Sequence, residues 1–510
     1  MKNSYRHWIT ARKVIQGVTL TAFLAFFIAA SSGWLSPALI NLGLRIDPLI
    51  ALAQSVASRK ILPGLLLGGA VLFLAFVFGR AWCGWICPLG TTLDLFPLQK
   101  RPKGKSFQPK DPPEKLRSLK YWILLLLLVA ALWGNLTLLI FDPLTVYYRS
   151  LTVAFWPGLD QVIRTAEAFF YRLPFLSDAI SQFDAWIRSS LLPALPLYKQ
   201  GAFLFFAVFL GILALNRLAP RFWCRYLCPL GGMLGLISKV SLLRRKVSPD
   251  CTGCKLCSAA CPTGTIDPNQ GYASDPSECT LCLDCLEACP RSSVEISPIL
   301  RPARLNPAYD PDRRQALLSL ATATVAVALF QRNWLRIQPP PFDIRPPGAD
   351  EKNLLSTCVR CGVCLRICPT GALQPDSLND GLEGLWTPIL VPRIGYCEFS
   401  CNQCGQVCPT QAIPSLPIEE KRQQVIGKAY IDQNHCLAWA DHKDCIVCEE
   451  MCPLPEKAIY LKETEVTLEN GDLKTIQLPV VQRDRCIGCG VCEYKCPLRG
   501  EAAIRVRSSI

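Results

Sequence analysis

Hydrophobic residues concentrate in the first part of the chain, in four long runs separated by polar and basic segments. Each run approaches the roughly 17–25 residues that a helix needs to cross a bilayer. A buried core helix is the alternative for three of them, and the first could also be a signal peptide. The pattern predicts an α-helical membrane bundle with four transmembrane helices, at 14–30, 61–78, 121–141 and 201–219.

Basic residues predict which loops face the cytoplasm, because Lys and Arg accumulate in cytoplasmic loops. The N-terminus, the 80–120 loop and the segment just after residue 219 are rich in Lys and Arg, whereas the loops near 34–60 and 142–200 are poor in them. We therefore expect a protein of the bacterial inner membrane with its N-terminus in the cytoplasm. The aromatic part of the 142–200 loop, at 150–200, is expected to lie at the membrane interface, with a quinone pocket there as the alternative.

A fifth apolar run, at 316–330, is short and only weakly apolar. Arg313 and Arg314 precede it and resemble a twin-arginine export signal. Export would place the residues after about 335 in the periplasm. Alternatively, the two arginines flank a membrane-associated or buried helix, which would be the fifth of the bundle. A proline-rich linker follows and includes Pro339, Pro340, Pro341, Pro346 and Pro347.

Cysteine dominates the second half of the chain, which holds most of the 28 cysteines. The spacing C-x2-C-x2-C-x3-C-P, typical of bacterial ferredoxins, recurs there. It predicts α+β ferredoxin-like domains that hold six [4Fe–4S] clusters. The expected ligands form six quartets: Cys251, Cys254, Cys257 and Cys261; Cys279, Cys282, Cys285 and Cys289; Cys358, Cys361, Cys364 and Cys368; Cys397, Cys401, Cys404 and Cys408; Cys436, Cys445, Cys448 and Cys452; Cys486, Cys489, Cys492 and Cys496.

The first two quartets have the separation of a compact two-cluster ferredoxin, in which the last cysteine of each run binds the other cluster. We therefore expect Cys289 to complete the site of the first quartet and Cys261 to complete that of the second. The quartets that begin at Cys397 and Cys436 have a widened first gap, which enlarges a loop without deleting a ligand. Spacing does not reveal which of the last four quartets exchange ligands.

The spacing disfavours three other uses of these cysteines. Disulfides are disfavoured because the cysteines are packed too closely along the chain. Zinc sites usually pair two separated C-x2-C knuckles rather than a tight run. A radical-SAM site at Cys397, Cys401 and Cys404 is disfavoured because Cys408 offers a fourth ligand.

Four further cysteines form two matching pairs. The segment from Arg80 to Gly90, with the sequence R-A-W-C-G-W-I-C-P-L-G, recurs from Arg221 to Gly231 as R-F-W-C-R-Y-L-C-P-L-G. This internal repeat predicts two related halves of the helical bundle. The spacing i, i+4 puts both thiols of a pair on one helical face. An additional redox or metal site is therefore predicted at Cys83, Cys87, Cys224 and Cys228, the alternative being a packing motif with idle cysteines.

The formal charge of +14 is not a sign of nucleic-acid binding. Each cluster with its four thiolates carries about −2, so six clusters contribute about −12. No nucleotide-binding glycine motif occurs. The three histidines, His7, His435 and His442, lie outside the predicted spans, which disfavours a bis-histidine haem in the membrane. Many one-electron centres in one chain favour an electron relay.

The expected domains are a membrane domain at 1–245, a two-cluster ferredoxin at 246–300, a linker at 301–350 and a four-cluster region at 351–510. Within the last, residues 455–482 alternate in the manner of a β-hairpin with its turn at Asn470-Gly471.

The two C-x3-C-P-L-G repeats and the two quartets after them resemble the NapH family of quinol-oxidising membrane subunits, and the MauN proteins. Residues from 313 onward resemble NapG and MauM, so the chain resembles a NapH–NapG fusion. The resemblance implies electron flow from the quinol pool, through the clusters, to a periplasmic redox enzyme or small carrier. The chain would then be an electron-transfer component rather than a stand-alone enzyme. Asp312 and Ala316 depart from the export pattern of the family.

Two alternatives to this function remain. A maturation factor of the CcoG/NosR type would use the clusters to reduce a metal or to maintain the centre of another enzyme; the S-G-A-T-type flavin site of NosR is missing from the sequence. A structural scaffold would use the clusters only to hold its fold.

Overall fold

A computed structural model of the chain describes residues 2–30, 35–98, 112, 114–193, 195–298, 313–331, 343–377, 381–467 and 473–508. Several predicted features lie outside these residues: the basic stretch at 99–111, the prolines at 339–341 and the Asn470-Gly471 turn. The chain divides into two compact units. Unit 1 comprises Met1–Ala29, Ala38–Ser150 and Phe203–Arg332, and unit 2 comprises Ala30–Pro37, Leu151–Ala202 and Asn333–Ile510.

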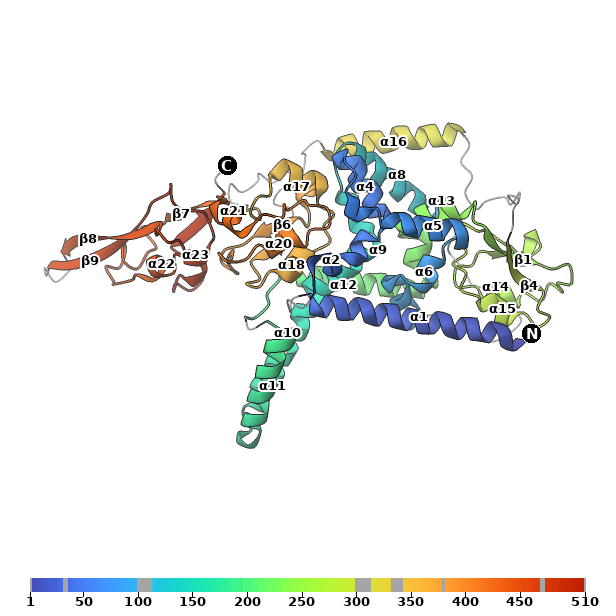
Figure 1. Cartoon of the computed structure of the whole chain (residues 1–510), viewed down its shortest axis with the longest axis horizontal. Coiled ribbons are helices and arrows are strands. Elements are labelled where there is room, and N and C mark those ends of the chain that lie inside the picture. Colours follow the sequence, from blue (N-terminus) through green and yellow to red (C-terminus); the bar gives the residue numbers. More distant parts are fainter. Residues whose placement is uncertain are drawn as a thin grey trace. The chain divides into compact units, whose positions relative to one another are not determined.

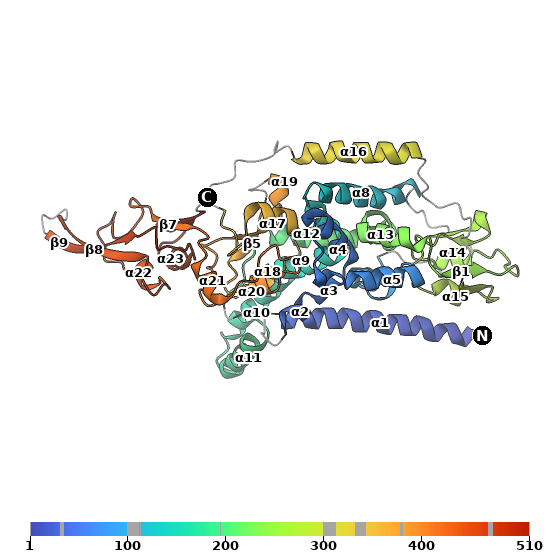
Figure 2. The ribbon, with the colours of Figure 1, turned by 45° about the horizontal axis from the view of Figure 1, so that its top comes forward.

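The helical part of unit 1 forms from the apolar runs. In Figures 1 and 2, α1 lies along one side of this part and α8 and α16 lie along the other, with α5 and α13 between them. The helices are α1 (Lys2–Ala29), α2 (Pro37–Ile40), α3 (Leu42–Arg45), α4 (Pro48–Ser58), α5 (Gly68–Phe78), α6 (Ala81–Trp85), α7 (Pro88–Leu95), α8 (Leu119–Leu132), α9 (Pro143–Ser150), α12 (Ala202–Ala214), α13 (Pro229–Ser238) and α16 (Arg313–Gln331).

Within the described residues, one segment is long and apolar enough to cross a membrane, Arg6–Ala29 of α1. This helix begins at Lys2 and therefore includes His7, which the sequence placed outside it. The other runs form shorter helices. The run at 121–141, for example, breaks after α8, where Gly134 adopts a positive φ of 77°. Short 3₁₀ turns replace the missing helix at η1 (Pro63–Leu65), η3 (Thr137–Phe141) and η6 (Leu215–Arg217).

The run at 316–330 forms a 19-residue helix, α16, that begins at Arg313. Ala323 and Val327 of this helix pack against Val129 and Ala130 of α8, and all four side chains are buried. The run is therefore part of the helical packing of unit 1.

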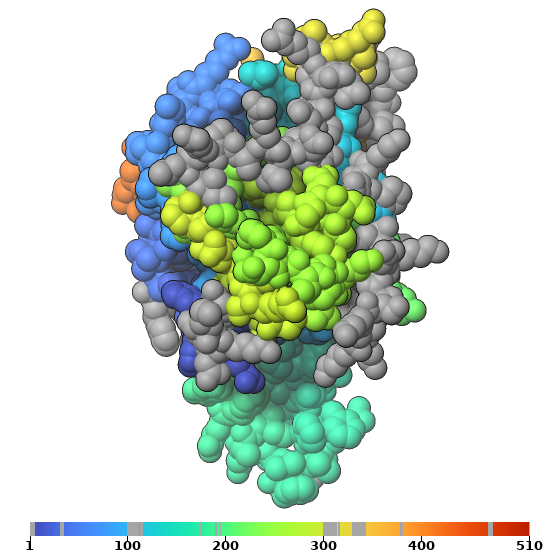
Figure 3. Space-filling view, turned by 90° about the vertical axis from the view of Figure 1, so that its right-hand side faces the viewer, coloured from blue at the N-terminus to red at the C-terminus, as the bar shows by residue number. Residues whose placement is uncertain are grey.

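Unit 1 also contains the first ferredoxin region, whose outer face is turned to the viewer in Figure 3. It has two antiparallel pairs of strands, β1 (Leu243–Val247) with β4 (Val294–Pro298) and β2 (Ile266–Asp267) with β3 (Ala273–Ser274). The one-turn helices α14 (Leu256–Ala260) and α15 (Asp284–Ala288) carry the third cysteine of each quartet.

Unit 2 joins the segment 151–202 to the C-terminal ferredoxin region. In the first part, α10 (Trp156–Phe170) and α11 (Ser177–Ser190) form a helical hairpin, in which Arg188 binds Asp160 at 2.5 Å and Glu167 at 3.1 Å. The helices of the second part are α17 (Glu351–Thr357), α18 (Val363–Ile367), α19 (Gly381–Gly384), α20 (Gln403–Gln406), α21 (Ile418–Gln423), α22 (Val447–Glu450) and α23 (Val491–Lys495).

Each sheet of the C-terminal region is a two-stranded antiparallel pair. β5 (Leu373–Pro375) pairs with β6 (Pro388–Leu390), and β7 (Lys428–Ile431) pairs with β10 (Ile504–Arg507). The pairing of β8 (Ile459–Thr467) with β9 (Leu473–Val481) confirms the predicted hairpin strands. Cys436, Ile476 and Leu478 share a buried cluster, so the hairpin covers one end of the cysteine-rich core.

Candidate metal centres

The regular quartets share one backbone feature. The residue after the second cysteine has a positive φ and precedes a one-turn helix that carries the third cysteine. This residue is Gly362 in one quartet and Gly490 in another, with φ of 82° and 83°. Lys255 and Leu283 occupy the same place in the first ferredoxin region, with φ of 61° and 68°. The left-handed residue turns the chain so that successive thiols point to one side.

In the first ferredoxin region, Cys261 does not stay with its own quartet. Its thiol interacts with the thiols of Cys279, Cys282 and Cys285. Cys257 interacts with Cys251 and Cys254. The position of Cys261 is the one that the expected ligand exchange requires, and the matching position of Cys289 stays a prediction.

The same exchange occurs between the third and fourth quartets, where spacing alone was uninformative. One cavity is lined by Cys358, Cys361, Cys364 and the distant Cys408. Cys368 instead interacts with Cys397, Cys401 and Cys404. Each group thus takes its fourth thiol from the other quartet.

The last two quartets exchange in the same way. A second cavity is lined by Cys436, Cys445, Cys448 and Cys496. Cys452 interacts with Cys489, which also interacts with Cys486 of its own quartet. The backbone N–H of Cys397 donates to the carbonyl oxygen of Cys489 at 2.8 Å, which brings the second of these pairs of quartets against the first.

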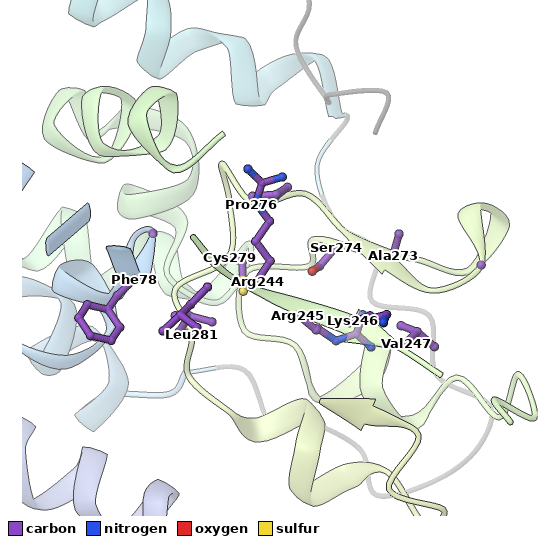
Figure 4. A pocket seen from close by; sticks show the side chains of 13 residues that line it. Phe78, Arg244, Arg245, Lys246, Val247, Ala273, Ser274, Pro276, Cys279 and Leu281 are labelled. Atoms are coloured by element: carbon purple, nitrogen blue, oxygen red, sulfur yellow. The ribbon is translucent and has the colours of Figure 1, made fainter. Parts of the chain in front are cut away.

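The surroundings of the thiols suit an anionic iron–sulfur core. Backbone N–H groups of Ser293 and Arg360 donate to the sulfurs of Cys289 and Cys358 at 3.3 and 3.4 Å. In Figure 4, Arg245 of β1 and Cys279 line the same cavity of about 270 Å³. The buried Nε of Arg245 has no partner among the described residues, although its guanidinium lies beside ligand thiols. Such donors stabilise thiolate and sulfide charge.

Burial disfavours thiolates unless a metal supplies positive charge. It raises the pKa of Cys279 to about 11 and that of Cys285 to about 12. Among the described residues, no three His, Cys, Asp or Glu side chains converge as they would around a single metal ion. A cubane core binds each thiolate through a different iron atom.

The two C-x3-C repeats face each other in unit 1. The first arginine of each repeat donates to the carbonyl oxygen of the first cysteine in the other: Arg80 to Cys224 at 3.1 Å and Arg221 to Cys83 at 3.2 Å. Gly231 permits this approach, because a Cβ there would lie 2.6 Å from Nη2 of Arg80. The repeat seen in the sequence is therefore a reciprocal contact in the fold.

This contact brings the four cysteines of the two pairs together. All four are buried, and the thiols of Cys87 and Cys228 both interact with those of Cys83 and Cys224. Burial raises the pKa of Cys224 to about 11 and raises the pKa of Cys87 and Cys228 well above the ordinary value. The site is thus a buried group of four sulfurs, contributed equally by the two repeats.

The first ferredoxin region binds the repeats through buried charge. Glu278 pairs with Arg80 at 3.0 Å and also with Lys120, and all three side chains are almost completely buried. Burial would raise the pKa of Glu278, but Lys120 and Arg80 more than offset this effect and lower it. Gly84 lies against the ferredoxin backbone, since a Cβ there would be 2.5 Å from the carbonyl oxygen of Thr280. No local sequence signal indicated these contacts.

The 151–202 segment contacts the third quartet within unit 2. Lys199 donates to the carbonyl oxygen of Leu373 at 2.7 Å, and the backbone N–H of Gln200 donates to Gln374 at 2.9 Å. The guanidinium of Arg366, between Cys364 and Cys368, lies 4.4 Å from the ring centre of Trp156. Burial lowers the pKa of Lys199 to about 8, while the thiols of Cys368 and Cys364 oppose that shift. The 151–202 segment therefore packs against the loop of the third quartet and the strand that follows it.

Comparison with known proteins matches three parts of the chain to iron–sulfur families. A family described as "4Fe-4S binding domain" matches residues 61–105 and 201–249, which contain the two repeats. A "4Fe-4S dicluster domain" matches residues 250–293, and a second "4Fe-4S binding domain" matches residues 355–374.

Known ferredoxin-type proteins of three kinds are similar to this chain. The methylamine utilization ferredoxin-type protein MauM of Paracoccus denitrificans is 35% identical over 213 residues, which are 40% of this chain and 91% of the relative. The ferredoxin-type protein NapG of Haemophilus influenzae is 33% identical over 39% of this chain and 73% of its own length. The methylamine utilization ferredoxin-type protein MauN of Methylobacillus flagellatus is 26% identical over 50% of this chain and 76% of its own length. No solved structure matches.

Proposed function

Because the chain belongs to the MauM/NapG family of ferredoxin-type proteins and joins such a region to one like NapH and MauN, we propose that it carries electrons from membrane quinol to a periplasmic redox partner. One observation carries this proposal: both units contain groups of cysteines with ferredoxin spacing. The ferredoxin region of unit 1 packs on the repeats, and that of unit 2 packs on the 151–202 segment. A [4Fe–4S] cluster at each group takes up and passes on one electron at a time.

The thiol groupings support six ligand sets. The chain would hold clusters with Cys251, Cys254, Cys257 and Cys289; Cys279, Cys282, Cys285 and Cys261; Cys358, Cys361, Cys364 and Cys408; Cys397, Cys401, Cys404 and Cys368; Cys436, Cys445, Cys448 and Cys496; and Cys486, Cys489, Cys492 and Cys452.

These sets suggest an order of transfer within unit 2. The set with Cys361 adjoins the one with Cys397 through their exchanged ligands, and Cys397 contacts Cys489 of the next set. The set with Cys436 is then last and lies under the β8–β9 hairpin. Lys199 and Trp156 lie at the opposite end of this series, beside the set with Cys361. Electrons would enter at that end and leave near the hairpin.

The contacts also support an assignment of the two ferredoxin regions to opposite sides of the membrane. The first ferredoxin region docks on the basic 80–120 side of the chain through Arg80 and Lys120. The C-terminal region docks on the 151–202 segment, which the pattern of basic residues assigns to the other side. We place four spans at α1, α5, α8 and α12 with their flanking turns. α16 would be the fifth, since 19 residues extend about 28 Å at 1.5 Å per residue.

The four buried cysteines of the repeats would hold an additional redox centre. Their meeting across two repeats, and the match of both repeats to a 4Fe–4S binding family, support a metal role over idle packing. Arg80 and Arg221 would offset the negative charge of such a centre, because both lie against the carbonyl groups of its cysteines.

The experiment that tests this function is reduction of the purified holoprotein, in detergent, by the soluble quinol duroquinol. We expect the visible absorbance of the clusters to bleach with duroquinol and with dithionite. If a protein with its full iron content is bleached by dithionite but not by duroquinol, the result would contradict quinol oxidation.

The alternative function is maturation of a partner enzyme by metal reduction, which the buried thiol group at the repeats also suits. Deletion of the gene discriminates the two functions. A partner enzyme that keeps its metal but receives no electrons supports the relay, whereas a partner that lacks its metal supports the maturation role.

A further inference from the structure

The two repeats are equivalent in sequence, but the first arginine of each repeat binds a different carboxylate. Arg221 pairs with Asp94, which follows the first repeat. The position equivalent to Asp94 in the second repeat is Gly235. Arg80 therefore has no carboxylate of the helical part to bind, and it takes Glu278 of the ferredoxin region instead.

The ferredoxin region fills the space at Gly235. A Cβ on this glycine would lie 2.8 Å from the carbonyl oxygen of Ser277, next to Glu278. The equivalent space at Asp94 is open: it forms a cavity of about 780 Å³, and the Asp94 side chain remains 31% exposed. One of two related sites is thus closed by the ferredoxin, and the other is available to a ligand.

The cavity has the size and polarity of a small-molecule site. Such sites measure roughly 300–1,000 Å³ and combine apolar walls with a few placed polar groups. The open side is apolar, since Leu95 and Leu98 line the cavity and are more than half exposed. A lipid-soluble ligand could enter there with its tail in the bilayer.

Two hydrogen-bond acceptors in the cavity suit a ligand with hydroxyl groups. Asn216 is buried, and its amide nitrogen donates to the carbonyl oxygens of Leu93 and Phe96. This fixes the orientation of the amide, so that its Oδ1 is an acceptor with no donor among the described residues. A buried acceptor without a donor costs about 1–3 kcal/mol. Asn216 Oδ1 and the Asp94 carboxylate both accept hydrogen bonds, which suits the hydroxyl groups of a ligand.

The cavity also adjoins a cluster site. Pro262, which follows Cys261, and Asp284, between Cys282 and Cys285, both belong to its wall. Arg12 of α1 binds Asp284 at 3.1 Å and the carbonyl oxygen of Cys282 at 2.7 Å, which holds this wall in place. A ligand here would lie next to the ferredoxin loops that carry four proposed ligand cysteines.

We propose that the cavity beside Asp94 and Asn216 binds the hydroquinone head group of membrane quinol. The inference rests on the proposed quinol oxidation and assigns its site. The two hydroxyl O–H bonds of the quinol break to give the quinone, two protons and two electrons. The electrons would pass one at a time to the two clusters of the first ferredoxin region, and the protons would pass to water on the polar side of the cavity, where the exposed Lys13 lines it. Asp94 and Asn216 hold the hydroxyl groups.

Gly17 of α1 gives a clean test, because it lines the cavity and a side chain there meets nothing within 4 Å. Gly17→Phe would fill the cavity without removing a contact. Gly69→Phe on α5 is the matched control, since Gly69 also faces open space but lies outside the cavity. Asn216→Leu is a second variant, which removes the acceptor together with the hydrogen bonds to Leu93 and Phe96, so its unfolding midpoint is measured beside its rate.

We expect Gly17→Phe and Asn216→Leu to lower the rate of reduction by dilute duroquinol at least tenfold, the effect of losing about 1.4 kcal/mol of binding. Iron content and reduction by dithionite should stay unchanged, and Gly69→Phe should behave like wild type. An azidoquinone photolabel should attach to α1 or α7 in wild type and not in Gly17→Phe.

The outcomes separate this site from the function on which it rests. If Gly17→Phe is reduced by duroquinol at the wild-type rate, or the label maps elsewhere, the site is wrong although quinol oxidation stands. If Gly17→Phe only loses a co-purified phospholipid, the cavity is a lipid site and the inference is overturned. If duroquinol fails to reduce the wild-type protein, the proposed function itself fails.

Discussion

Lys199 donates a hydrogen bond from its Nζ to the carbonyl oxygen of Leu373 at 2.7 Å. The lysine precedes the fourth apolar run, and the leucine lies in β5, just after the third quartet. The bond therefore joins a loop between two predicted spans to the C-terminal cysteine groups. A loop and a domain that pack together must lie on the same side of a membrane.

Topology reporters provide the first prediction. A reporter fused after residue 350 should be active only outside the cytoplasm, because the chain after α16 packs on the 151–202 segment. A fusion after residue 247 is the control and should report the cytoplasm, since β1 belongs to the ferredoxin region that docks on Arg80 and Lys120. A cytoplasmic signal at both positions would contradict transfer across the membrane but not the cluster assignments.

Removal of Glu278 should destabilise the first ferredoxin region strongly. In Glu278→Ala, Arg80 and Lys120 would remain as buried charges without their carboxylate, which costs about 3–5 kcal/mol. The midpoint of thermal unfolding in detergent, followed by cluster absorbance, measures the effect. Glu287→Gln changes an exposed glutamate of the same region and should leave the midpoint unchanged.

The contribution of Glu278 should also depend on pH in a defined direction. Its pKa in the folded protein is lower than its ordinary value, because Lys120 and Arg80 outweigh its burial. The stabilisation is therefore complete above the ordinary pKa of a glutamate and is lost as the pH falls through the lower, folded value. The difference in unfolding midpoint between wild type and Glu278→Gln should shrink on acidification. A difference that grows in acid would contradict this assignment.

The sequence could propose the three cysteines that begin each regular group because their spacing is local. Cys358, Cys361 and Cys364 lie within seven residues, so one loop and one turn of helix determine their positions. The fourth ligand could not be predicted, since Cys408 reaches this group only through the packing of two quartets. The pairing of Lys120 with Glu278 was equally inaccessible, because 158 residues separate the two side chains.

The apolar runs were a weaker guide to helix length than to helix position. The run at 61–78 begins with the 3₁₀ turn η1, and α5 starts only at Gly68. Glycines at 64, 68 and 69 lower the helix propensity of this part of the run. The repeat around Cys83 and Cys224 predicted related halves. It did not reveal that Gly235 breaks their equivalence, since that difference has meaning only beside Glu278.

Ligand exchange in the C-terminal region predicts an unusual pattern of cluster loss. Cys408→Ala should abolish the same EPR signal as Cys361→Ala, because both thiols line one cavity. Cys404→Ala should abolish a different signal, because its thiol faces Cys397 and Cys368. If Cys408→Ala and Cys404→Ala abolish one common signal, the quartets do not exchange ligands.

The last prediction concerns the four buried cysteines of the repeats. If they hold a [4Fe–4S] centre, Cys83→Ser should lower the iron content by about four atoms per chain. The six other clusters should keep their EPR signals, since the thiol of Cys83 interacts with the other three cysteines of the repeats. Thr91→Ser changes a buried residue of the neighbouring helix α7 and should leave the iron content unchanged. An iron content that corresponds to six clusters in wild type and in Cys83→Ser alike would show that the repeat cysteines bind no cluster.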